Sequence, residues 1–120
     1  MEYYNKALDI NIKVFGLEHP NVASVYNNIG MVYYLLGDYT KALEYHFKSL
    51  PIFEKVLGKD HSSTATSYGN IGMIYYELGG YAKALDYYSK ALSIVEKALG
   101  KDHPETATAY SCIGRVYCYL

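Results

Sequence analysis

The sequence repeats itself every 42 residues, and this period constrains the fold more than any other feature. Residues 23–64, aligned without gaps on residues 65–106, are identical at 26 of 42 positions. The glycines and histidines that recur at this spacing are Gly16, Gly58 and Gly100; His19, His61 and His103; and Gly30, Gly72 and Gly114. A fixed period of this length is typical of stacked supersecondary units. We therefore expect a repeat array in this chain.

Each period reads as two helices joined by a short turn. Residues 65–78 carry an apolar face at helical spacing, Gly79-Gly80 interrupts it, and a second apolar stripe runs through residues 81–99. Gly100 stands where a left-handed C-terminal cap is expected, and Pro104 suits the first turn of the next helix. No segment alternates apolar and polar residues with period two, so we expect no strands. The predicted helices span residues 2–15, 21–36, 39–57, 63–78, 81–99 and 105–119.

We call the helix before each glycine-containing turn A and the longer helix B, so the chain reads B-A-B-A-B-A. Gly30, Gly72 and Gly114 lie inside A helices, where a glycine costs about 1 kcal/mol relative to alanine. We attribute this cost to close approach of a B helix. The small partners expected on the B helices are Ala42, Ala84 and Ala91. Pro51 lies inside a B helix and is expected to bend it near residues 47–51 without ending it.

Composition and motifs exclude several classes of function. The net charge of −1 argues against the broad basic surface of a nucleic-acid-binding protein, and no apolar stretch reaches the roughly 18–20 residues of a membrane helix. The sequence has no phosphate-binding loop, nucleophile elbow or paired-carboxylate pattern, so we expect neither enzymatic activity nor a cofactor. Cys112 and Cys118 form no disulfide framework, which favours a reducing compartment and a cytoplasmic protein.

The recurring histidines invite comparison with a metal site. Equivalent residues of successive repeats should lie about 10 Å apart, because packed helices are separated by about that distance. Zinc requires ligands at about 2 Å. We therefore predict that His19, His61 and His103 are loop or helix-entry residues, and we expect no metal site.

The repeated residues resemble the signature of the tetratricopeptide repeat family. The matching run is Tyr68, Ile71-Gly72, Tyr75, Leu78-Gly79, Tyr81, Ala84, Tyr88 and Ala91. The 42-residue period exceeds the usual 34 of that family and is similar to the repeats of kinesin light chain and nephrocystin-like proteins. Residues 94–104 and 25–29 carry that closer match. The resemblance implies an all-α, right-handed superhelix, or α-solenoid, of antiparallel helix pairs.

The resemblance also implies one array over residues 1–120. It would comprise a half repeat (1–22), two repeats (23–64 and 65–106) and a second half repeat (107–120), as a piece of a longer array. A concave groove lined by the A helices would bind a peptide or partner helix, which makes the chain a protein-interaction scaffold. A regulatory repeat domain attached to an enzyme or motor is a further alternative.

The A helices carry a second stripe of amide, methionine and tyrosine side chains away from their packing face. Asparagine pairs with a peptide backbone, methionine adapts its shape, and tyrosine offers contact area. The residues predicted to line the groove are Asn27, Asn28, Met31, Tyr34, Asn70, Met73, Tyr76, Glu77 and Arg115. In the alternative interpretation the asparagines bridge neighbouring helices and the methionines only pack.

The first B helix has no A helix before it in this sequence, and the last A helix has no B helix after it. Apolar surface left exposed in this way tends to be covered. An alternative function is therefore self-assembly, in which the terminal helices of two copies join head to tail into a homo-oligomer. The residues predicted for these ends are Tyr4, Leu8, Phe15, Tyr110, Ile113 and Tyr117.

Overall fold

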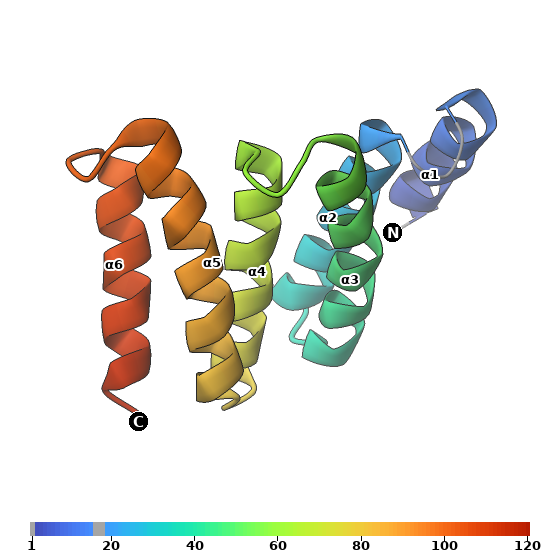
Figure 1. Ribbon diagram of the computed structural model, residues 1–120. Coiled ribbons are helices and arrows are strands. Elements are labelled where there is room, and N and C mark those ends of the chain that lie inside the picture. The colour runs from blue at the N-terminus through green and yellow to red at the C-terminus, as the bar shows by residue number, and fades with distance from the viewer. Residues whose placement is uncertain (1, 16–18) are drawn as a thin grey trace. The chain divides into compact units, whose positions relative to one another are not determined.

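The computed structural model describes residues 2–15 and 19–120, except for the side chains of residues 2, 4, 11 and 13–15. Each predicted helix is present in this part of the chain, with boundaries within two residues of the prediction (Figure 1). The helices are α1 (Glu2–Phe15), α2 (Pro20–Leu35), α3 (Tyr39–Val56), α4 (Ser62–Glu77), α5 (Tyr81–Leu99) and α6 (Pro104–Tyr117). The all-α repeat fold is thus confirmed.

The chain divides into two compact units, residues 1–58 and 59–120. In unit 1, α2 and α3 form an antiparallel hairpin and α1 packs against α2. In unit 2, α4 and α5 form the equivalent hairpin and α6 packs against α5. The predicted handedness of a superhelix concerns the placement of one unit on the other and stays a prediction.

The recurring histidines begin the three A helices. Each has extended backbone angles at the N-cap position, and its Nδ1 accepts a hydrogen bond from an amide of the first turn. Such a cap satisfies one of the amides that a helix start leaves without a partner. The donors are the N–H groups of Asn21 at 3.0 Å, Ser63 at 3.0 Å and Glu105 at 3.2 Å. The prediction that these histidines are helix-entry residues is confirmed.

Gly100 follows α5 with φ 85° and ψ 171°. The positive φ agrees with the predicted cap, but the ψ value lies outside the left-handed helical region. This combination of angles is accessible almost only to glycine. The chain therefore leaves α5 in an extended direction toward α6 and makes no left-handed helical turn.

Helix α3 continues through Pro51 to Val56, so the predicted continuity of this helix is confirmed. The proline side chain is exposed. The Ser49 hydroxyl donates a hydrogen bond of 2.9 Å to the carbonyl of His46, five residues before the proline. A serine bonded to its own helix in this way often accompanies a bend.

Gly30 and Gly72 do mark close approach between an A helix and the B helix that follows it. The close partners, however, are aromatic rings. A Cβ at Gly30 would lie 2.8 Å from Nε2 of His46, and a Cβ at Gly72 would lie 3.0 Å from Cδ1 of Tyr88. The Ala42 carbonyl lies 3.2 Å from the Cβ position of Gly30, in agreement with the predicted partner, whereas the three atoms nearest to the Cβ position of Gly72 all belong to Tyr88. Ala84 and Ala91 stay predicted partners. The glycines make room for a large ring, which fills the space that two small residues would leave empty.

Gly114 differs from its two equivalents. A Cβ added there meets no atom within 4 Å. The given sequence contains no B helix after α6, so the predicted close approach stays a prediction at this position.

Candidate functional site

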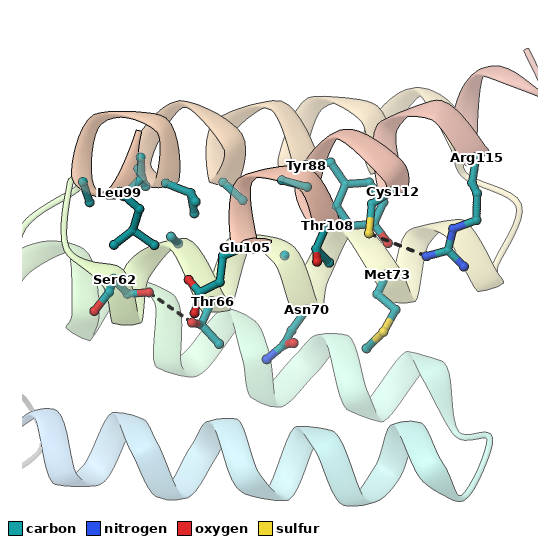
Figure 2. A pocket seen from close by; sticks show the side chains of 17 residues that line it. Ser62, Thr66, Asn70, Met73, Tyr88, Leu99, Glu105, Thr108, Cys112 and Arg115 are labelled. Carbon is teal, nitrogen blue, oxygen red and sulfur yellow. Dashed lines mark hydrogen bonds between the residues drawn. The ribbon is translucent and has the colours of Figure 1, made fainter. Parts of the chain in front are cut away.

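Unit 2 contains an open pocket of about 350 Å³ (Figure 2). One wall is formed by α4, the opposite wall by α6, and the floor by α5. All of its lining residues belong to unit 2, so the pocket is a property of that unit alone.

The floor and inner walls are apolar. Tyr88, Ala91 and Ile94 of α5 are buried beneath the pocket. Tyr88 belongs to the core cluster that it forms with Ala84 of α5 and Val116 of α6, so the floor rests on packed side chains. The small residues of the floor and walls keep the pocket open, and they include Ala65, Ala98 and Ala109.

Polar side chains surround this apolar floor. The hydroxyl of Thr66 donates to the Ser62 carbonyl at 3.1 Å, and the hydroxyl of Thr108 donates to the Pro104 carbonyl at 3.0 Å. Because each hydroxyl hydrogen is used within its own helix, the threonine oxygens keep lone pairs as acceptors. An incoming N–H group would find these acceptors on both walls.

Opposite charges mark the two ends of the α6 wall. Glu105 lies in the first turn of α6 and Arg115 in the last turn (Figure 2). Ten residues of helix separate them, which corresponds to about 15 Å along the axis. The pocket therefore has an acidic end and a basic end.

Arg115 is held at its end of the pocket by two contacts. Its Nη2 donates to Sγ of Cys112 at 3.6 Å, and its guanidinium lies 5.7 Å from the ring centre of Tyr76. The hydrogen bond to Cys112 is the main reason that the pKa of Arg115 is raised above its ordinary value. The guanidinium is therefore a permanent positive charge, positioned by the side chains of α4 and α6.

The predicted groove residues of unit 2 divide into two groups. Asn70, Met73 and Arg115 line the pocket. Tyr76 instead packs against Tyr81 and Tyr119, with ring centres 5.7 Å apart in both pairs. Glu77, the last residue of α4, is exposed; neither it nor Tyr76 lines the pocket.

The predicted groove residues of unit 1 lie on α2. Asn27, Met31 and Tyr34 are half-buried, and Asn28 is exposed. Tyr34 packs against Tyr39, with ring centres 5.5 Å apart. None of these four residues lines the pocket of unit 2.

Our sequence reasoning missed the floor of the pocket. It assigned the groove to the A helices, whereas α5, a B helix, contributes six of the lining residues. The available signal was the apolar stripe predicted for residues 81–99, whose second half contributes Ile94, Val95, Ala98 and Leu99 to the pocket. Thr108 and Cys112 lie on the predicted stripe of α6 but were not selected.

The predicted end residues have different environments. Tyr110 and Tyr117 are 49% and 61% exposed, whereas Ile113 is half-buried against the core cluster of α5 and α6. Tyr110 also donates a hydrogen bond to Glu96. On α1, Leu8 is half-buried, and the side chains of Tyr4 and Phe15 lie outside the described residues.

The described residues support neither a metal site nor a membrane-spanning helix. No three histidine, cysteine, aspartate or glutamate side chains among residues 2–15 and 19–120 are grouped to hold a metal ion. None of the helices in this part of the chain combines the length and apolarity needed to cross a membrane.

Comparisons with known proteins agree with this geometry. The tetratricopeptide repeat model matches residues 2–55, 22–97 and 63–120. A search of curated proteins finds no match. The crystal structure of BtubC (BKLC) from P. vanneervenii is similar over 98% of this chain and 47% of its own, with 27% identity and a TM-score of 0.89.

A putative kinesin light chain with nearly identical TPR-like repeats, from Podosopora anserina, shares the fold. It is similar over 98% of this chain and 56% of its own, with 22% identity and a TM-score of 0.88. The present chain thus spans about half the length of these two structures. With the family model matched along the described helices and the repeats resembling those of kinesin light chain, the chain belongs to the tetratricopeptide repeat family.

Proposed function

We propose that the pocket of unit 2 is part of a groove that binds a peptide or partner helix. Tetratricopeptide repeats are in general protein-interaction scaffolds, and their fold is a non-catalytic one. The observation that carries the proposal is the apolar floor of α5 bordered by polar residues of α4 and α6. Concave apolar sites with a few placed polar groups are the usual form of a binding site.

The lining residues specify the chemistry of the partner. Apolar side chains of the partner would lie on Ala91 and Ile94, and its backbone N–H groups would meet the threonine acceptors of both walls. Glu105 and Arg115 favour a segment with a basic group at one end and an acidic group at the other. Their separation of about 15 Å corresponds to four or five residues of extended chain.

The test is a peptide selected from a random displayed library and measured by titration calorimetry. Ala109→Phe places a ring in the pocket, and we expect the dissociation constant to rise at least about tenfold. Ala107→Phe is the matched control, because Ala107 is exposed on the same helix and does not line the pocket. Equal weakening by both variants, or by neither, would remove the pocket from the binding site.

Asn28→Ala and Asn70→Ala then define the extent of the groove. Asn70 lines the pocket and Asn28 lies in unit 1. Weaker binding in both variants supports a groove along both A helices, as the sequence predicts. Weaker binding in Asn70→Ala alone confines the peptide to unit 2.

A second candidate function is self-assembly through the terminal helices. The observation that favours it is aromatic exposure at both ends of the chain, where Tyr3 is 85% exposed and Tyr117 is 61% exposed. Large exposed apolar side chains of this kind often mark a protein interface.

The state of the two cysteines indicates the cellular compartment in which the protein works. Cys112 and Cys118 are both free. Free thiols suit a reducing environment, and we propose the cytoplasm as the site of function.

A further inference from the structure

The hairpin of unit 1 is joined by a cluster of three tyrosine rings and a lysine. Tyr45 of α3 lies against Tyr26 and Tyr33 of α2, with ring centres 6.2 and 5.6 Å apart. Tyr33 and Tyr45 are stacked, with 17° between their planes. The Lys48 ammonium lies 4.8 Å from the centre of the Tyr45 ring and 5.7 Å from that of Tyr26. Stacked rings and a cation over an aromatic face each stabilise such a contact.

The hairpin of unit 2 repeats this cluster with the equivalent residues. Tyr87 of α5 lies against Tyr68 and Tyr75 of α4 at 6.1 and 5.8 Å, and the stacked pair is inclined by 14°. Lys90 lies 5.1 Å from the Tyr87 ring centre. Two independent hairpins thus show the same way for a B helix to dock on an A helix. We call this arrangement the tyrosine clasp.

Beside each clasp lies the glycine that receives a ring of the B helix. Gly30 receives His46 and Gly72 receives Tyr88. The residue after the central clasp tyrosine therefore fills the glycine position. We call this glycine position the seat. The clasp and the seat together fix the register of the B helix on the A helix.

A third set of the same residues is divided between the two ends of the chain. Helix α6 carries the A half, with Tyr110 and Tyr117 at the clasp positions and Gly114 at the seat. Tyr110 and Tyr117 are 49% and 61% exposed, and nothing lies within 4 Å of a Cβ built at Gly114. This face of α6 thus presents a complete A half with an open seat.

Helix α1 carries the B half. The residues of α1 that are identical to their α5 equivalents, 84 positions later, are Tyr3, Tyr4, Lys6, Ala7, Leu8, Ile10 and Lys13. Tyr3 is 85% exposed and Ile10 is 61% exposed, whereas Ile94, the equivalent of Ile10 in α5, is 5% exposed. The residues that form the clasp and fill the glycine position in unit 2, Tyr87, Lys90 and Tyr88, therefore have identical equivalents on α1 in Tyr3, Lys6 and Tyr4.

We propose that α1 of one copy docks on α6 of a second copy in the register of the tyrosine clasp. Tyr3 would lie against Tyr110 and Tyr117, and the register brings position 4 to Gly114. The contact is heterologous, so repetition builds a ring or an open chain of copies. This inference deepens the second candidate function, because it names the partner as a second copy and fixes the contact residues.

The test exploits the open seat at Gly114. Sedimentation velocity from about 1 μM to about 1 mM should show a mass that rises above 13.6 kDa with concentration. Gly114→Ala leaves the monomer unstrained because its Cβ meets nothing, but it should weaken self-association at least about tenfold by obstructing the seat. Gly69→Ala is the matched control, since it adds the same methyl group to open space on α4.

A mixing experiment tests the register directly. Tyr3→Glu impairs the α1 end at a side chain that is 85% exposed, so the monomer fold is retained. Each variant alone keeps one working end, so it should stay at 13.6 kDa at concentrations where the wild type has begun to associate. Mixed in equal amounts, Tyr3→Glu and Gly114→Ala should form a heterodimer of twice 13.6 kDa and nothing larger.

Three outcomes would overturn the inference. A constant mass of 13.6 kDa for the wild-type chain at all concentrations excludes a second copy as the partner, along with the self-assembly function. Association as strong as that of the wild type in both single variants means that copies join through another surface, so the clasp register fails while self-assembly stands. A mixture that stays monomeric, although the wild type associates, also contradicts the clasp.

Discussion

The hairpins of the two units are built on the same positions, and they differ most at one buried ring. Unit 1 places His46 against Gly30, and unit 2 places Tyr88 against Gly72. His46 is fully buried, and neither of its ring nitrogens has a hydrogen-bond partner. The comparison shows that the seat selects for the flat shape of a ring rather than for its polar groups. Unit 1 retains the packing but buries polar atoms without compensation, which destabilises a fold.

The largest expected effect is a dependence of the stability of unit 1 on pH. Burial lowers the pKa of His46 from 6.5 to about 4. Above pH 6.5 the imidazole is neutral in both folded and unfolded chains, so pH has no effect through this group. As the pH falls from 6.5 to about 4, only the unfolded chain gains the proton, and unfolding becomes easier by about 3 kcal/mol.

The measurement is urea unfolding followed by circular dichroism between about pH 7.5 and about pH 4. His46→Phe keeps a ring in the seat but cannot be protonated, so this variant should lose the His46 part of the pH dependence. All other titrating groups are common to the two proteins and cancel in the difference. Parallel pH profiles for wild type and variant would contradict the burial of an uncharged His46.

The second-largest expected effect is the change in stability when a glycine of an A helix is replaced by alanine. Gly30→Ala should destabilise the protein by about 1–3 kcal/mol, because a Cβ lies 2.8 Å from a fully buried ring. Gly72→Ala should cost less, since the closest approach of a Cβ there is 3.0 Å.

Gly69→Ala supplies the control for both. It has open space for a Cβ, and it should stabilise the protein by up to about 1 kcal/mol through helix propensity. Thermal unfolding of the three variants gives the order. A stabilising Gly30→Ala would show that the His46 ring moves aside.

The smallest expected effect concerns the starts of the B helices α3 and α5. The Asp38 carboxylate accepts a hydrogen bond from the Lys41 amide at 3.2 Å, whereas Gly80 provides no side-chain cap for α5. Asp38→Ala should cost about 1 kcal/mol, and Asp38→Gly, which recreates the junction of unit 2, only a few tenths. Urea titration measures both. Asp38→Asn is the control that retains a capping oxygen, and a loss as large as that of Asp38→Ala would argue that charge, not capping, matters here.

A comparison of the predicted groove residues with the pocket shows how much of the candidate site could be predicted from the sequence. Asn70, Met73 and Arg115, which the sequence predicts on one stripe of the A helices, all line the pocket, because the helical period determines which residues share a face. Tyr76 lies on the same predicted stripe but turns to Tyr81 and Tyr119. Which neighbour an aromatic ring at the edge of a stripe contacts depends on the adjoining helix, and the pattern of one helix does not contain that information.

The sequence by itself determined the helices, their order and their boundaries. These features are local: the 42-residue period, the helical spacing of apolar residues, and the histidines and glycines at the helix ends act within a few residues of chain. Only the tertiary structure decided which ring fills each glycine seat, that α5 supplies the floor of the pocket, and that Gly114 remains open. The physical reason is that contacts between helices depend on axial rotation and on side-chain volume at both partners, which become defined when two helices pack together.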